Sequence, residues 1–131
     1  MFNHVMVGAS DLDRAKTFYD AVLGTLGFSG EAIRSVAPSG HVRLFYMHNG
    51  NTFGVSEPIN GEPASFGNGA TVGFKCDSPE QVRAFHDAGV AAGGTSVEDP
   101  PGLRNGAMGP MHLSYLRDPD GNKLCAIHRP K

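Results

Sequence analysis

The sequence predicts an α+β fold made of two pseudo-symmetric modules, each with the element order strand, helix, strands. The chain has 131 residues, 40% of them hydrophobic and 18% charged, which fits one compact domain. Eighteen glycines and nine prolines indicate many turns between short strands rather than long helices. A shift of the chain by 67 residues aligns Phe18-Tyr19-Asp20-Ala21 with Phe85-His86-Asp87-Ala88, and this internal repeat predicts two related modules.

The first half of the chain has the pattern of a strand, a helix and two further strands. Residues 2–7 are rich in Val and alternate loosely, as strands do. Ser10 is suited to cap a helix, and apolar residues with helical spacing follow it from about 12 to 26. Strand-like runs come near residues 41–47 and 52–56, and Asn49-Gly50 between them is typical of a hairpin turn.

The second half repeats this order. A strand is expected at residues 70–77, and a helix at 79–92 that begins with Pro79 and ends at Gly93-Gly94. The segment between the halves is rich in Gly, Pro, Asn and Ser, which is typical of a linker. The single domain, residues 1–131, is therefore divided into module one at about 1–57, a linker at about 58–69 and module two at about 70–131.

Charge and cysteine content narrow the classes of function. Eleven basic and thirteen acidic residues are scattered without a run of one sign, so we expect neither a nucleic-acid partner nor a membrane partner. No stretch has the length of a membrane span and the first ten residues do not resemble a signal peptide, so a cytoplasmic location is expected. Cys76 and Cys125 are then expected to be reduced thiols packed as small apolar groups.

The stretch from Glu98 to Pro110 is rich in Gly and Pro and has the length of a functional loop. We expect it to form a lid, with hinges at Gly102, Gly106 and Gly109.

Three motifs of the chain resemble those of the vicinal oxygen chelate superfamily. They are His4-Val5-Met6-Val7 at the start, Asp13-Arg14-Ala15 followed by Phe18-Tyr19 in the first helix, and Arg117-Asp118-Pro119-Asp120-Gly121-Asn122 before the last strand. The superfamily contains glyoxalase I, bleomycin-resistance proteins, fosfomycin-resistance enzymes and extradiol dioxygenases. The resemblance covers nearly the whole chain.

The resemblance implies two βαβββ modules whose mixed sheets form an open barrel around a cavity, and it implies a homodimer. It also implies where a divalent metal such as Zn, Ni, Mn or Fe would be held, namely by His or Glu on the first and last strands of each module. His4 matches the first of these positions. The repeat places Thr71, Gly54 and Cys125 at the other three, where this chain departs from the pattern.

A single imidazole cannot hold a divalent ion, because such sites need about three protein ligands. Cys125 could join His4 as a soft ligand, but glycine has no side chain and a threonine hydroxyl is a weak ligand. Glu57 does not replace Gly54, because residues three apart in a regular strand point to opposite faces. We therefore expect no metal and no other cofactor, with a divalent metal as the alternative.

Arg43 and Phe45 lie on one face of their strand by alternation, and the resemblance to fosfomycin-resistance enzymes places Tyr115 in the cavity. In the alternative interpretation, the two aromatic residues belong to the core and Arg43 is a surface cation. With His4 and Cys125, these are the expected ligand-binding residues, and no catalytic residue is assigned.

The function expected is binding of a small, anionic or aromatic molecule in the cavity. The alternatives are a metal-dependent lyase or isomerase of the glyoxalase I type and a non-catalytic interaction domain. The remaining histidines, His41, His48, His86 and His128, are expected to be solvated, and His112 is expected at the surface or in the lid.

Overall fold

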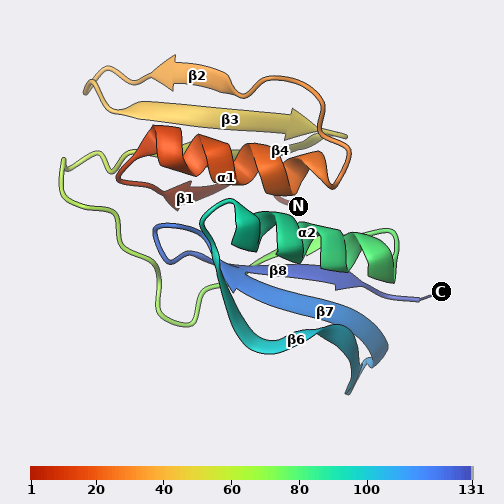
Figure 1. The fold of residues 1–131 in the computed structure, drawn as a ribbon. Coiled ribbons are helices and arrows are strands. Elements are labelled where there is room, and N and C mark those ends of the chain that lie inside the picture. Colours follow the sequence, from red (N-terminus) through yellow and green to blue (C-terminus); the bar gives the residue numbers. More distant parts are fainter. Residues whose placement is uncertain (131) are drawn as a thin grey trace.

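Two four-stranded sheets lie next to each other, and both helices cover the same side of the pair (Figure 1). The computed structural model describes residues 1–130. Module one contains β1 (Val5–Gly8), α1 (Leu12–Gly24), β2 (Ile33–Val36), β3 (Val42–His48) and β4 (Asn51–Ser56). Module two contains β5 (Val72–Lys75), α2 (Pro79–Ala91), β6 (Thr95–Gly106), β7 (Gly109–Arg117) and β8 (Lys123–His128). The prediction of an α+β fold is confirmed.

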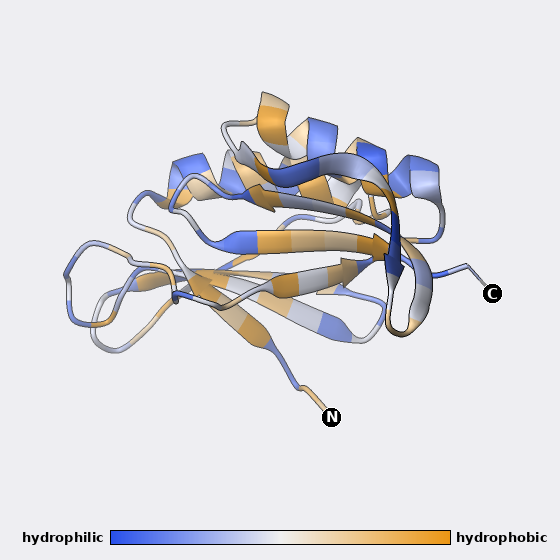
Figure 2. Ribbon diagram, turned by 90° about the horizontal axis from the view of Figure 1, so that it is seen from below, coloured by the Kyte–Doolittle hydropathy of each residue, from blue (hydrophilic) through white to orange (hydrophobic). Residues whose placement is uncertain are grey.

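The two sheets have the same strand order, and the first strand pairs with the last in the same register in each, which confirms the internal repeat. The orders are β1-β4-β3-β2 and β5-β8-β7-β6. In each sheet the first strand pairs in parallel with the last, so that Val5 lies beside Phe53 in module one and Val72 beside Leu124 in module two. The sheets do not close, and the side away from the helices stays open (Figure 2). We call this side the open face.

The core lies between the helices and the sheets and is continuous from one module to the other. Phe18 of α1 and Phe85 of α2 are fully buried. The rings of Phe53 and Phe74 lie 5.4 Å apart across the junction of the two modules. Gly89 allows the close packing, because a Cβ there would lie 2.2 Å from Leu116 and 3.1 Å from a methyl group of α1.

The turn Asp118–Asn122 joins module two to module one through a buried polar network. Asp118 is 4% exposed, and its carboxylate accepts hydrogen bonds from the Tyr19 hydroxyl at 2.5 Å and from both nitrogens of Asn122. Asn122 also donates to the Gly8 carbonyl oxygen at 2.9 Å. The motif that carried the family resemblance is therefore a structural connection in this chain. Burial and the Asp118 carboxylate raise the pKa of Tyr19 well above its usual value.

The prediction that Glu98 to Pro110 form a lid is wrong. Residues 98–106 continue β6 and residues 109–110 begin β7, so the segment is a hairpin. A bulge interrupts the pairing between Val97 and Gly102. Arg104 donates to the carbonyl oxygens of Asp99 and Pro100, and Arg83 donates to that of Pro101 at 3.2 Å. Backbone pairing and two arginines therefore fix the segment that its composition marked as mobile.

Other details of the prediction also change. The N-cap of α1 is Asp11 rather than Ser10, because the Asp11 carboxylate accepts the hydrogen bond from Arg14 N–H. The prediction that His86 is solvated is wrong: it is 9% exposed, and its Nε2 lies 2.7 Å from Ser96 Oγ. Cys76 and Cys125 are free, buried thiols. Within residues 1–130, no helix is long and apolar enough to cross a membrane.

Candidate functional site

On the open face of module one, Met6 lies directly over Gly54. The two residues are partners in the parallel pairing of β1 and β4. A Cβ built on Gly54 would lie 2.0 Å from the Met6 sulfur and 3.3 Å from the Phe45 ring. The thioether thus fills the space that a longer residue at position 54 would need, and Gly54 is buried.

The corresponding pair on module two is Gly73 beside Cys125. The register that sets Met6 against Gly54 is the same, but here the first strand has the glycine and the last strand has the sulfur. A Cβ on Gly73 would meet no atom within 4 Å, so the space beside Cys125 is open. Burial raises the pKa of the Cys125 thiol, and a hydrogen bond from Tyr115 only partly opposes this effect. Cys125 is therefore a neutral thiol at physiological pH.

Tyr115 lies beside Cys125 in the pairing of β7 and β8 and belongs to a chain of polar contacts. The Lys123 ammonium lies 4.8 Å from the centre of the Tyr115 ring and forms an ion pair with Glu98. Glu98 has a φ of 60°, which is in the left-handed region where glutamate is rare. The bulge of β6 thus places a carboxylate next to the lysine at the edge of the open face.

Arg43 is the cation of module one on this face. Its Nη2 donates to Ser35 Oγ at 3.0 Å, and its guanidinium carbon lies 5.5 Å from the centre of the Phe45 ring. Its Nε is buried and has no hydrogen-bond acceptor among residues 1–130. Neither Phe45 nor Tyr115 belongs to the core cluster, and both are half-buried. The alternative that these two aromatics are core residues is therefore wrong.

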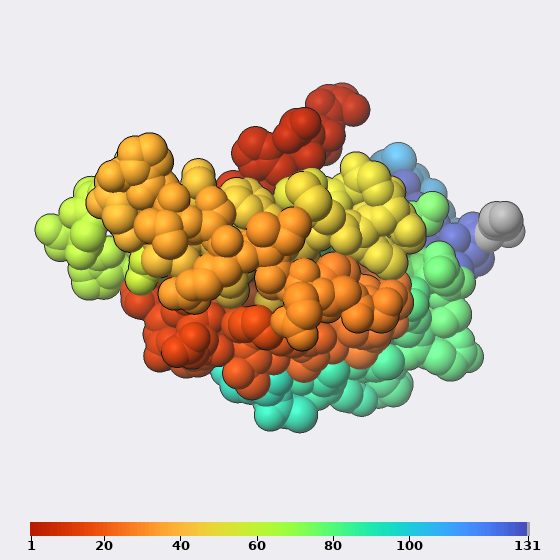
Figure 3. Space-filling view, turned by 90° about the horizontal axis from the view of Figure 1, so that it is seen from above, coloured from red at the N-terminus to blue at the C-terminus, as the bar shows by residue number. Residues whose placement is uncertain are grey.

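The four family metal positions do not converge on a ligand set. His4 lies in the N-terminal arm, residues 1–4, which projects from the body of the molecule (Figure 3), and its Nδ1 lies 2.8 Å from the Asn3 side chain. Thr71 is exposed and Gly54 lies under Met6. Glu57 points elsewhere and accepts a hydrogen bond from Val42 N–H at 2.7 Å. Among residues 1–130, no three His, Cys, Asp or Glu side chains could together hold a metal ion.

The two sheets remain separate four-stranded sheets and do not close into a barrel. Two hollows of about 420 and 430 Å³ lie elsewhere, and none of the five expected ligand-binding residues lines either of them. Sequence reasoning missed Met6, Lys123 and Glu98 at the open face. Alternation from His4 could have placed Met6 on this face, but the ion pair of Lys123 and Glu98 depends on the bulge in β6, which the sequence pattern does not show.

A family model, described as the Glyoxalase/Bleomycin resistance protein/Dioxygenase superfamily, matches residues 1–126. Among solved structures, a glyoxalase/bleomycin resistance protein from Albidiferax ferrireducens T118 is 56% identical, with a TM-score of 0.88 over 98% of this chain and 99% of that chain. A glyoxalase-related enzyme from Fulvimarina pelagi is 20% identical, with a TM-score of 0.73 over 99% of this chain and 88% of that chain. At that identity, the second likeness concerns the fold alone.

Proposed function

Because this chain belongs to the glyoxalase/bleomycin resistance protein/dioxygenase superfamily, we propose that it binds a small, anionic or aromatic molecule on its open face without the help of a metal ion. The observation that carries this proposal is the buried Nε of Arg43, which has no acceptor among residues 1–130. A buried donor without a partner costs about 1–3 kcal/mol, and an acceptor from a ligand would remove that cost.

The surroundings of Arg43 favour a planar anion. A guanidinium presents parallel N–H groups that match a carboxylate or phosphate, and Ser35 takes only one of these donors. The Phe45 ring lies beside the guanidinium and offers a flat apolar surface to the rest of the ligand. Tyr115 of module two supplies a hydroxyl group on the same face, beside Lys123, which is paired with Glu98.

The residues at the family positions support the proposal of binding without a metal. The Met6 thioether closes the position at Gly54, and burial keeps the Cys125 thiol protonated. His4 alone, on an exposed arm, gives one ligand where about three are needed. We therefore assign the ligand-binding role to Arg43, Phe45, Tyr115 and Cys125, with His4 at the edge.

Calorimetric titration with benzoate tests this assignment. Benzoate should bind the wild-type protein, and Arg43→Gln should weaken the binding about tenfold or more, since a charged hydrogen-bonding pair is lost. The matched control is Arg34→Gln, because Arg34 is exposed on the neighbouring strand β2 and alternates to the other face. Equal binding by the wild type and Arg43→Gln would remove Arg43 from the site.

We also propose that the chain forms a homodimer. Ile33 and Met47, on the open-face side of β2 and β3, are 52% and 59% exposed, and the outer edges of β2 and β6 have no partner strand among residues 1–130. Light scattering at micromolar concentration should give twice the chain mass. Met47→Lys should shift the protein toward the monomer, whereas Val90→Lys, at an exposed site on α2, should not. A wild-type monomer would contradict the proposal.

A further inference from the structure

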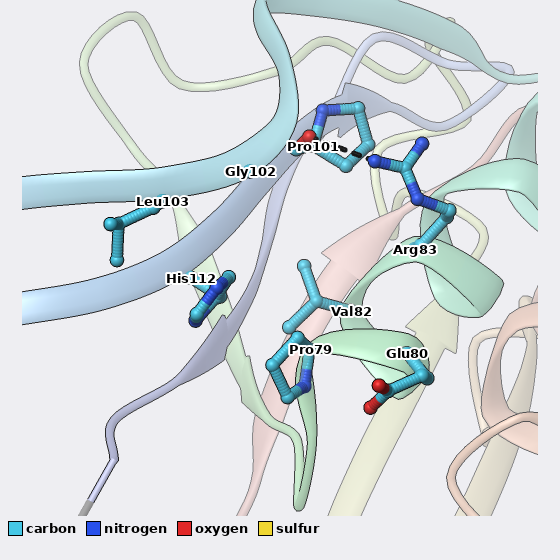
Figure 4. A pocket seen from close by; sticks show the side chains of 8 residues that line it. All are labelled: Pro79, Glu80, Val82, Arg83, Pro101, Gly102, Leu103 and His112. Carbon is cyan, nitrogen blue, oxygen red and sulfur yellow. Dashed lines mark hydrogen bonds between the residues drawn. The ribbon is translucent and has the colours of Figure 1, made fainter.

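A separate hollow of about 420 Å³ lies on the helix side of module two, between the first half of α2 and the β6–β7 hairpin (Figure 4). Its walls come from Pro79, Val82 and Arg83 on the helix and from Pro101, Leu103 and His112 on the hairpin. The volume is within the range of about 300–1,000 Å³ that is usual for small-molecule sites. The sheet separates this hollow from the open face.

The hairpin is what creates the hollow. Strand β6 has 12 residues, whereas β2, its counterpart in module one, has 4. On the helix side of β7, Ser114 and Leu116 are fully buried, and Ser114 Oγ donates to the Val82 carbonyl oxygen. His112, two residues before Ser114 on the same side, is only half-buried. The helix therefore leaves the far part of the hairpin partly uncovered.

His112 gives the hollow one polar group that the protein leaves without a partner. Its Nδ1 is buried, and no group of residues 1–130 forms a hydrogen bond with it. The neighbouring His128 differs, because its Nδ1 lies 3.1 Å from the Cys76 carbonyl oxygen. Figure 4 shows the His112 ring between the side chains of Leu103 and Pro79. A buried imidazole nitrogen in apolar surroundings needs a hydrogen-bonding group, and a ligand could supply it.

The charges around the hollow favour a neutral ligand. Arg83 donates to the Pro101 carbonyl oxygen, and Glu80 contributes a carboxylate to the same lining, so the two formal charges cancel. The remaining walls are aliphatic or proline rings, and Leu103 has 54% of its surface exposed beside them. An apolar wall with one unpartnered imidazole suits a ring that carries one hydroxyl group.

We propose that this hollow is a second ligand site, which binds a small neutral ring compound of the phenol class through a hydrogen bond between the hydroxyl group and His112 Nδ1. The site is independent of the anion site proposed on the open face. The two differ in position and in the charge of the ligand that they select.

Titration of the isotope-labelled protein with phenol and with anisole, followed by NMR, tests the proposal. Phenol should shift the backbone amide signals of Val82, Arg83 and Leu103, and should bind about tenfold more tightly than anisole, which has no hydroxyl proton. In His112→Phe, which keeps an aromatic ring and removes the nitrogen, the two compounds should bind equally weakly.

Two further outcomes would overturn the proposal. One is equal binding of phenol and anisole by the wild-type protein, and the other is shifts confined to the open face or absent altogether. If His112→Phe fails to fold, the comparison of phenol with anisole on the wild type still decides the result. Arg43→Gln should bind phenol as the wild type does, which separates this site from the proposed anion site.

Discussion

The open faces of the two modules share one backbone register and differ in their side chains. In module one the sulfur residue Met6 stands on the first strand and covers Gly54 on the last, whereas in module two Gly73 stands on the first strand and Cys125 on the last. The glycine and the sulfur residue have exchanged strands. A repeated fold thus does not give a repeated site, because the cross-strand partner decides whether a position is filled or open.

The helices show a second difference between the modules. Tyr19 of α1 donates to Asp118 of module two, and its counterpart in α2 is His86, which bonds only within its own module to Ser96 and Asp87. One polar connection between the modules therefore runs from α1 to the turn Asp118–Asn122, and another joins the Gln81 side chain of α2 to the Thr25 carbonyl oxygen. Module one depends on a contact with module two that has no symmetric equivalent at His86.

The largest effect is expected for this connection. Asp118→Ala should lower the free energy of unfolding by about 3 kcal/mol or more, because Tyr19 and Asn122 would keep buried donors without an acceptor. Asn49→Ala, in the two-residue turn of module one, should cost about 1 kcal/mol, because Asn49 has a φ of 50° and is exposed. Urea unfolding measures both, and equal losses would show that the turn of module two is not a special connection.

The exchanged glycines should respond differently to one added methyl group. Gly54→Ala should lower the free energy of unfolding by about 1–3 kcal/mol, because the new Cβ would overlap the Met6 sulfur. Gly73→Ala should change it by less than about 0.5 kcal/mol, since the space there is open.

Replacing Met6 together with Gly54 sharpens this comparison. Met6→Ala/Gly54→Ala should recover part of the stability that Gly54→Ala loses, and a double-mutant cycle by thermal or urea unfolding measures the recovery. If the losses in the free energy of unfolding of Met6→Ala and Gly54→Ala simply add in the double variant, Met6 does not cover Gly54 in solution.

The smallest effect is expected at alkaline pH. Burial raises the pKa of Cys76 to about 11 and raises that of Cys125. Above the pKa near 9 of the unfolded thiol, only the unfolded chain releases these protons, so the free energy of unfolding falls as pH rises. The double variant Cys76→Ala/Cys125→Ala should lose less of its free energy of unfolding between pH 9 and 10 than the wild type does. Urea unfolding at each pH measures this loss, and an equal loss in both proteins would contradict the prediction.

In that variant, the buried tyrosines of module one should still lower the free energy of unfolding at alkaline pH. Burial raises the pKa values of Tyr19 and Tyr46, whose hydroxyls donate to Asp118 and Asp20. Their unfolded forms titrate near pH 10, so the loss that they cause begins about one pH unit above the start of the loss caused by the thiols.

The sequence could predict the elements that have strong periodic patterns and specific turn residues. Both helices and the β3–β4 hairpin with its Asn49-Gly50 turn lie within a few residues of their predicted positions. Strand β2 could not be predicted, because three of its four residues are exposed and no alternation marks it. In β6, Pro100 and Pro101 at the bulge are residues typical of a loop. The segment is nevertheless a strand, because it pairs with β7 on both sides of the bulge.

Residues of the candidate site could be predicted only where alternation along a strand determines on which face of the sheet they lie. Arg43 and Phe45 follow from alternation in β3, and the repeat pairs Gly54 with Cys125. The contact of Met6 with Gly54 depends on the register of two parallel strands more than 40 residues apart, which no local pattern encodes. The binding role of His4 stays a prediction.

Measuring the metal content of the protein is the most direct test of the proposal that the open face binds its ligand without a metal ion. The untagged protein is incubated with Zn²⁺, Ni²⁺, Mn²⁺ or Fe²⁺, passed through gel filtration and analysed for metal. We expect far less than one ion per chain, and no change on His4→Ala. About one ion per chain that is lost in His4→Ala would contradict the account, because it would mean that ligands other than those seen around Gly54 and Cys125 complete a metal site.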